Sequence, residues 1–229
     1  ILKEYNLNFN NRTNILKKNN YLSKKYLNLF LKNLLSNSNY LQYNIVYKIS
    51  EKVKKKLKLE KSLLELSGPI YVFGDIHGNY TQLVEYLKKI EFFKTDVKIL
   101  LLGDYIDKGP KCLHTISLLF CMKLLYPNRI YLLRGNHETE NVNKYFGFYN
   151  ECCLKYGVIF GSKLWKHINN TFNYLSIGAI IDNQIFCIHA GLSPNLNNIY
   201  DINNIIKGST IPNSGVLCDL LWSDPKKNQ

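Results

Sequence analysis

The sequence predicts an α/β fold built on parallel strands, and two observations support this. Three short runs, residues 69–73, 98–102 and 129–133, are branched and apolar on both faces, as is typical of parallel strands buried under helices. Each run is followed within two residues by a glycine and polar residues, and then by a stretch with helical periodicity. Strand, motif and helix in repetition indicate βαβ units, in which ligands bind at the carboxyl ends of the strands.

The 229 residues suffice for one full core with a modest appendage. We expect residues 1–36, rich in Asn and Lys, to form an N-terminal extension that is partly disordered and partly helical, with a helix over 21–35 and a break at 36–39. Residues 37–229 form the folded domain. Its first element is an amphipathic helix over 41–57, apolar at every fourth position, with a lysine-rich face that we assign to solvent rather than to a membrane surface.

The remaining elements follow from local patterns. Residues 63–67 lead to the first strand, and helices are expected over 79–92, from Pro110 onward and over 140–156. Residues 177–181 and 184–188 flank Asp182-Asn183, which predicts a hairpin. Its second strand ends directly at His189, a fourth strand end that carries a ligand-type residue.

The net charge of +13 lies almost entirely within residues 1–62, so the body of the chain is nearly balanced. Only Arg12, Arg129 and Arg134 among the 30 basic residues are arginine, whereas nucleic-acid surfaces favour arginine, so no nucleic-acid partner is expected. No apolar run approaches the roughly 18 residues of a membrane span. Six cysteines without a CxxC pair indicate reduced thiols in a cytoplasmic or nuclear protein.

The polar residues at the strand ends are carboxylates, imidazoles and an amide. They are Asp75, His77, Asp104, Asp107, Asn136, His137 and His189. This set of ligand types suits a pair of divalent ions better than a structural zinc, which favours thiolates.

The order of these residues along the chain suggests which of them bind each of two ions. Asp75 and His77 converge on a first ion if the backbone turns between them, and Asp104 bridges two ions through its two oxygens. Asn136 offers an oxygen and His189 a nitrogen to complete the ligands of the second ion. Two ions close together lower the pKa of a shared water and clamp a phosphoryl oxygen, which indicates hydrolysis of a phosphate ester by the resulting hydroxide.

A histidine and a carboxylate remain for proton transfer. His137, adjacent to Asn136, is placed to protonate the leaving oxygen, and Asp107 is the carboxylate expected to orient it and stabilise its charged form.

The segments 74–78, 103–107, 133–138 and 189–194 resemble the successive metal motifs of the metallophosphoesterases. Segments 145–152 and 217–225 resemble parts of the serine/threonine protein phosphatases of the type 1, type 2A and calcineurin group. The resemblance covers about residues 40–229. It implies a four-layer β-sandwich flanked by helices, with the metal site at the sheet edge.

The resemblance also implies ligands, cofactors and partners. Asp75, His77 and Asp104 would hold the first metal, and Asp104, Asn136 and His189 the second, with His137 and Asp107 as the proton source. The cofactors would be two divalent ions, manganese or iron and zinc. Phosphoprotein substrates and regulatory or scaffolding subunits are the partners that this group implies.

Three departures from the group stand out. Lys108 stands where the group usually has a phosphate-binding arginine, and a lysine cannot form the bidentate hydrogen bonds of a guanidinium to phosphate. Ala190 stands where the group usually has a glycine. The group continues beyond the position of Gln229 with a further metal histidine, a phosphate-binding arginine and strands that complete the sandwich. Because the chain also starts at Ile1, we expect it to be a fragment of a longer protein, with an incomplete C-terminal side.

Two alternatives to a protein phosphatase stay open. Lys108 and the early end suggest a catalytically impaired pseudophosphatase that acts as a binding module. A phosphodiesterase or dinucleotide hydrolase on the same scaffold is disfavoured by segment 217–225. His114 and His167 are assigned to packing or surface roles, and Trp165 and Trp222 to the core.

Overall fold

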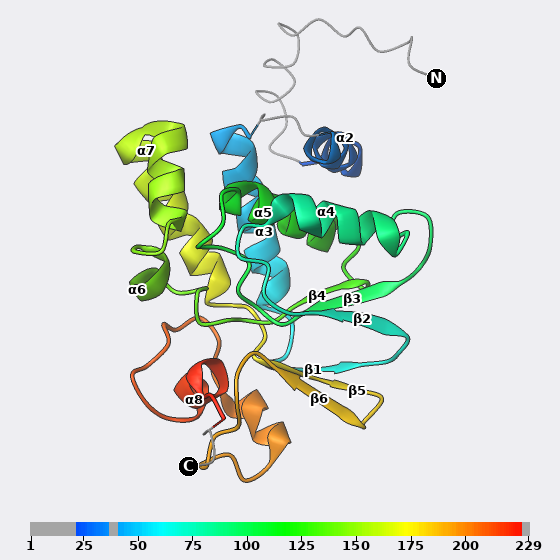
Figure 1. Ribbon diagram of the computed structural model, residues 1–229, viewed down its shortest axis with the longest axis vertical. Coiled ribbons are helices and arrows are strands. Elements are labelled where there is room, and N and C mark those ends of the chain that lie inside the picture. Colours follow the sequence, from blue (N-terminus) through cyan, green and yellow to red (C-terminus); the bar gives the residue numbers. More distant parts are fainter. Residues whose placement is uncertain (1–21, 37–40, 226–229) are drawn as a thin grey trace, which may run out of the picture.

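The computed structural model describes residues 22–36 and 41–225, and Figure 1 shows two three-stranded sheets stacked between helices. The mixed α/β sandwich confirms the predicted fold class. The expected disorder over residues 1–20 and most of the break at 36–39 lie outside the described residues. No helix in the described part of the chain is long and apolar enough to span a membrane.

The first sheet consists of the three predicted parallel strands. They are β2 (Ile70–Phe73), β3 (Lys98–Leu101) and β4 (Ile130–Leu132), in the order β2-β3-β4. The expectation of burial on both faces is wrong for β2, where Tyr71 and Val72 are 47% and 46% exposed. β2 is one of the two edge strands of this sheet in the described residues, whereas Ile130 and Leu132 on β4, the other edge strand, are buried.

The second sheet contains the predicted hairpin and a strand that sequence reasoning missed. β5 (Gly178–Ile181) and β6 (Ile185–Ile188) are antiparallel, and β1 (Leu63–Leu66) pairs with β5 in parallel. Asp182 and Asn183 both have positive φ, 51° and 55°, as the tight hairpin turn requires. Residues 63–67 therefore form a strand of the second sheet rather than only the approach to the first.

Helices cover the outer face of each sheet. α2 (Lys24–Leu35), α3 (Tyr43–Leu57), α4 (Tyr80–Lys89) and α5 (Cys112–Leu125) lie on the side of the first sheet, whereas the 3-10 helix η1 (Ile199–Asn204) and α8 (Val216–Trp222) lie on the side of the second (Figure 1). The apolar stripe predicted on α3 is buried throughout. α5 begins at Cys112, so Pro110 precedes the helix instead of occupying its first turn.

Three hydrophobic cores separate these four layers, and strand alternation distributes residues among them. Ile99 and Leu101 face the helices, whereas Leu100 between them faces the second sheet. On β1, Leu64 points between the sheets and Leu63 points toward η1 and α8. The period of two along each strand thus builds helix, sheet, sheet and helix into one stack.

The single helix predicted over 140–156 is wrong. The structure has a short α6 (Glu140–Asn143), a break, and the long α7 (Phe148–Phe172). Gly147 at φ 124° interrupts the helix, and Tyr145 and Phe146 just before it are 75% and 53% exposed. A second glycine, Gly157, kinks α7 with φ 75° and ψ 158°.

The tryptophans and cysteines divide between core and surface. Trp165 is buried as predicted, but Trp222 is 47% exposed at the end of α8, so its assignment to the core is wrong. All six cysteines are free thiols, and four of them are buried.

Candidate active site

The loops that leave the strands of the first sheet bind one another through their backbones. The N–H groups of Ile76 and His77 both donate to the carbonyl oxygen of Asp104, at 3.0 and 2.9 Å. His77, Asp104, Asp107 and Lys108 all have positive φ between 44° and 69°. Non-glycine residues adopt this left-handed region at a cost, and they cluster where a site needs a particular side-chain direction.

Asp104 lies at the centre of the site and is buried. Its Oδ2 is 3.4 Å from Nε2 of His77, and its Oδ1 is 3.4 Å from Nε2 of His189. Asp75 joins the cluster from the solvent side, with Oδ2 3.5 Å from Nε2 of His77. The structure therefore brings together the carboxylates and imidazoles that the sequence predicted, with Asp104 between two histidines.

Two of these histidines have their second ring nitrogen against a backbone carbonyl. Nδ1 of His77 is 2.9 Å from the oxygen of Ile106, and Nδ1 of His189 is 3.1 Å from that of Leu102. Because a carbonyl only accepts, both Nδ1 atoms carry the proton, and in the neutral rings the Nε2 lone pairs face Asp104. Lone pairs opposed to a carboxylate require a cation or extra protons between them, and backbone-oriented imidazoles of this kind are typical metal ligands.

Asn136 provides a further indication that these residues suit a metal ion. Its Oδ1 atom is buried without a hydrogen-bond partner within the described residues. A buried amide oxygen costs free energy unless something is bound to it. Together with the donors around Asp104, the unpartnered oxygen fits a divalent cation, which accepts carboxylate, imidazole and amide ligands alike.

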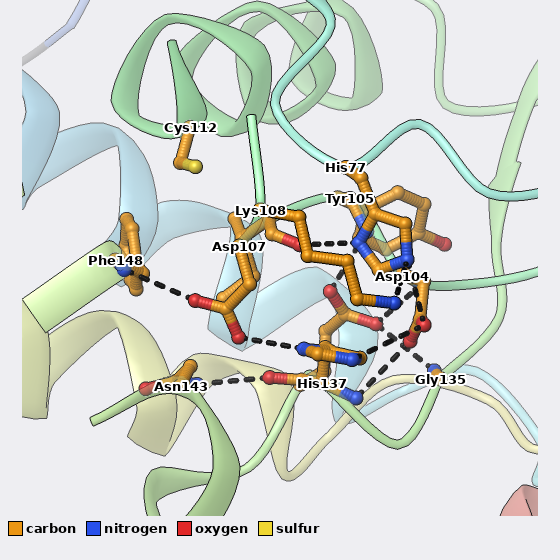
Figure 2. Close-up of polar contacts among 12 residues, drawn as sticks. His77, Asp104, Tyr105, Asp107, Lys108, Cys112, Gly135, His137, Asn143 and Phe148 are labelled. Carbon is orange, nitrogen blue, oxygen red and sulfur yellow. Dashed lines mark hydrogen bonds and ion pairs between the residues drawn. The ribbon is translucent and has the colours of Figure 1, made fainter. Parts of the chain in front are cut away.

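His137 differs from the other two histidines in the partner of its Nδ1. That atom lies 2.7 Å from Oδ2 of Asp107, a carboxylate that is completely buried (Figure 2). The other oxygen of Asp107 accepts the backbone N–H of Phe148 at 3.0 Å. Nε2 of His137 is left facing Asp104 at 3.8 Å. His77, Asp104 and His137 also offer ligand atoms within 4.8 Å of one another, so proximity alone does not separate a ligand from a proton donor.

Lys108 reaches into the same cluster from the surface. Its Nζ lies 2.9 Å from Nε2 of His77, and its backbone N–H donates to the carbonyl of Phe146. The Lys108 ammonium thus lies where a metal cation would meet Nε2 of His77 (Figure 2).

Glu138 is a supporting residue to which sequence reasoning gave no role. Its buried carboxylate accepts the backbone N–H groups of Asp104 at 2.7 Å, Tyr105 at 2.9 Å and Gly135 at 3.0 Å. Burial, reinforced by the nearby charge of Asp104, raises its pKa well above the usual range, while these hydrogen bonds oppose the shift. Its signal in the sequence was a carboxylate placed directly after the Asn136-His137 pair.

Hydrogen bonds from Arg134 also fix the loop that carries Asn136 and His137 to the rest of the fold. The buried Arg134 donates to Asn173 Oδ1 at 2.6 Å and to the carbonyl of Ser209 at 2.9 Å. Burial lowers the pKa of this guanidinium to about 10. Because its donors are used inside the fold, Arg134 serves structure rather than phosphate binding.

A close approach of two glycines lets this loop meet the loop of Asp104. A Cβ on Gly103, which has φ 117°, would overlap the backbone nitrogen of Gly135. The two glycines are therefore required by the packing of one motif against the other.

The family model of the calcineurin-like phosphoesterases matches residues 68–229, which contain all of these loops. The chain belongs to this family. The predicted membership of the metallophosphoesterase superfamily is thereby confirmed, and so is phosphoesterase chemistry as the general activity of the fold.

Solved structures similar to this chain include two phosphatases. The chain superimposes with a TM-score of 0.80 and 28% identity on a protein serine/threonine phosphatase from Saccharomyces cerevisiae with similarity to human phosphatase PP5, over 90% of this chain and 67% of that one. A cold-active protein-tyrosine phosphatase of a psychrophilic Shewanella species gives a TM-score of 0.48 and 19% identity over 60% of this chain and 46% of that one.

Proposed function

We propose that this calcineurin-like phosphoesterase hydrolyses phosphoserine and phosphothreonine in proteins with the help of two divalent ions. The observation that carries the proposal is the pair of His137 and Asp107 beside the ligand cluster of Asp104. The likeness to the yeast serine/threonine phosphatase supports the choice of substrate. Regulatory subunits and a cytoplasmic or nuclear location belong to the same proposal.

The partners of the three imidazoles distinguish their roles. His77 and His189 place Nδ1 on backbone carbonyls, which leaves Nε2 free to bind a metal ion. His137 places Nδ1 on the carboxylate of Asp107, which orients the ring as in a general acid and leaves Nε2 to face the substrate. We therefore assign the first two to metal binding and His137 to general acid catalysis.

The remaining residues hold the ions and the substrate. Asp75, His77 and Asp104 would bind one ion, and Asp104, Asn136 and His189 the other. Manganese, iron and zinc all accept this donor set. When bound, such ions supply an acidified water and neutralise charge on the phosphoryl oxygens. Lys108 and the amide of Asn136 contact the phosphate, and His137 delivers a proton from Nε2 to the leaving serine or threonine oxygen.

Substrate competition tests the proposal. The purified chain, loaded with Mn²⁺, is offered phosphoserine and phosphothreonine peptides, bis(4-nitrophenyl) phosphate and a dinucleoside polyphosphate at equal concentration. Phosphate release from the peptides, with little from the diester or the dinucleotide, is the expected result. Preference for either of the last two would assign the chain to the phosphodiesterase or dinucleotide hydrolase alternative instead.

A binding role without catalysis is favoured by one observation, the contact of Lys108 Nζ with Nε2 of His77. An ammonium at this position competes with an ion for the same lone pair. Metal analysis of the chain separates the two functions, because a hydrolase should retain close to two ions per chain and a pseudophosphatase fewer. The variant Lys108→Ala should raise the metal content if the lysine is the competitor.

A further inference from the structure

A cavity of about 440 Å³ lies outside the metal cluster, where the end of α3 and the start of β1 meet the end of α7 and the segment after η1. Lys58, Lys61 and Lys207 contribute lysine side chains to its lining, and Glu60 is its acidic member. None of these residues belongs to the site around Asp104. They come from segments about 150 positions apart, so the fold, rather than a run of lysines, collects the charge here.

The charge in this cavity is not balanced by its own acid. Glu60 lies with Oε1 2.5 Å from Nζ of the fully buried Lys123, and its charge also acts on Lys207, so this one carboxylate is shared among several ammonium groups. Lys61 pairs with Glu65 at 2.7 Å on the exposed rim. Among the described residues, neither Lys58 nor Lys207 forms an ion pair.

Each of these two ammonium groups contacts a neutral group instead of a carboxylate. Nζ of Lys207 donates to the carbonyl of Leu57 at 2.6 Å, and burial lowers the pKa of this lysine to about 8. Nζ of Lys58 lies 4.6 Å above the ring of Tyr174. A positive group that burial disfavours is stabilised by a nearby anion.

The walls of the cavity are cross-linked by hydrogen bonds. Ser62 Oγ donates to the carbonyl of Ile205 at 2.7 Å, and the N–H of Leu63 donates to Asn203 Oδ1 at 3.0 Å. The N–H of Gly208 donates to the carbonyl of Asn173 at 2.7 Å. A site whose walls are already formed loses little entropy when a ligand binds.

We propose that this cavity, which we call the lysine pocket, binds a dianionic phosphate group, either as inorganic phosphate or on a phosphorylated side chain. Its volume is within the range of small-ligand sites. Lysine ammonium groups bind phosphate as point charges, and the Ser62, Tyr174 and Asn203 side chains supply polar contacts at the walls. The proposal does not depend on the proposed catalytic function, because it concerns binding alone.

The test is a titration of metal-free protein with inorganic phosphate. Binding is measured by calorimetry and by changes in amide chemical shifts. Metal-free protein is used because bound ions would recruit phosphate to the other site, and the variant Lys108→Gln removes the lysine of that site. The parent chain should bind phosphate, and Lys108→Gln tests whether the other site contributes to that binding. Lys58→Gln/Lys207→Gln should bind at least about tenfold more weakly, since two charge-assisted contacts are lost. Lys55→Gln, on the exposed face of α3, is the matched control and should be unchanged.

Two outcomes would overturn the proposal, namely an affinity unaffected by the double variant or binding lost in Lys108→Gln alone. Because Lys207→Gln also removes the hydrogen bond to Leu57, the single variant Lys58→Gln is measured beside it. This exposed substitution should leave the unfolding temperature unchanged and still weaken binding several-fold.

A phosphoserine peptide and its unphosphorylated form distinguish the two sources of phosphate. Tighter binding of the phosphopeptide than of inorganic phosphate assigns the pocket to a phosphorylated chain, and equal or weaker binding assigns it to the free ion. Equal affinity for the two peptides contradicts a phosphate site.

Discussion

Nδ1 of His137 lies 2.7 Å from Oδ2 of the buried Asp107, whose second oxygen is held by the backbone of Phe148. The ring is thus fixed from one side, with Nε2 as its free nitrogen. The carbonyl of His137 is fixed as well, by Asn143 at 3.0 Å, which in turn accepts the indole N–H of the buried Trp165. This support makes the roles within the site separable by mutation.

Replacement of His137 by asparagine should abolish proton donation without loss of metal. Turnover of a phosphopeptide is expected to fall by about 10² or more, as for removal of a general acid. Metal analysis of the purified variant should give the same content as the parent chain. Loss of metal in His137→Asn would instead show that this imidazole is a ligand, as its distance to Asp104 permits.

Replacement of Glu138 by glutamine should destabilise the fold. The carboxylate accepts three backbone N–H groups, and the NH₂ group of a glutamine would oppose one of them. An unsatisfied buried donor and the lost charge-assisted bonds together predict a decrease of about 2–3 kcal/mol in the free energy of unfolding, measured with urea. The control is Glu65→Gln, which breaks only an exposed ion pair with Lys61. It should change the free energy of unfolding by less than about 0.5 kcal/mol.

Alanine at Gly103 should separate the loops of Asp104 and Asn136. Its Cβ would overlap the backbone of Gly135, and neither backbone can yield without moving a ligand. We expect lower stability and at least a tenfold loss of metal affinity, measured by titration with Mn²⁺. Gly74→Ala is the matched control, because a Cβ there meets no atom within 4 Å. Equal metal binding by both variants would contradict the close approach.

Arginine at Lys108 should improve substrate binding. The guanidinium offers a bidentate fork to phosphate where the ammonium offers a point charge, so KM for a phosphopeptide should fall several-fold, with kcat nearly unchanged. Lys108→Gln should raise KM. An unchanged KM in both variants would place Lys108 outside substrate binding.

The buried His114 predicts a loss of stability in acid. Burial, together with the charges of Lys155 and Lys111, lowers its pKa from 6.5 to about 4, and neither ring nitrogen has a hydrogen-bond partner in the described part of the chain. Between these two pH values the unfolded chain takes up a proton that the folded chain does not, so the contribution of this group falls as the pH drops from 6.5 to 4. Urea unfolding at several pH values should show that the free energy of unfolding depends less steeply on pH in His114→Leu than in the parent chain. A slope equal to that of the parent chain would mean that other groups cause it.

Much of the site could be predicted because its residues follow strands. Asp75, Asp104 and His137 lie a few residues after apolar runs, and parallel strands end at one edge of a sheet, so residues far apart in the sequence come close together in space. The function of Glu138 could not be predicted in this way. Its partners at Asp104 and Tyr105 are more than 30 positions away, and a backbone N–H carries no sequence signal.

The errors in secondary structure have a similar cause. The sequence does not show whether a glycine will break a helix. The apolar pattern from Glu140 to Tyr156 therefore predicts one helix, although Gly147 divides it into two. β1 is only four residues long, and what makes it a strand is its parallel pairing with β5, more than a hundred positions later.

The kink of α7 at Gly157 has a consequence for the behaviour of the protein in solution. Around it Leu154, Val158, Ile159 and Phe160 are between 56% and 88% exposed, so several large apolar side chains face solvent on a strongly cationic chain. At low ionic strength the net charge of +13 keeps molecules apart, but salt screens this repulsion, and excluded salts such as sulfate strengthen apolar association. The protein should therefore self-associate as ammonium sulfate is added, and it is best purified and stored in dilute chloride buffers.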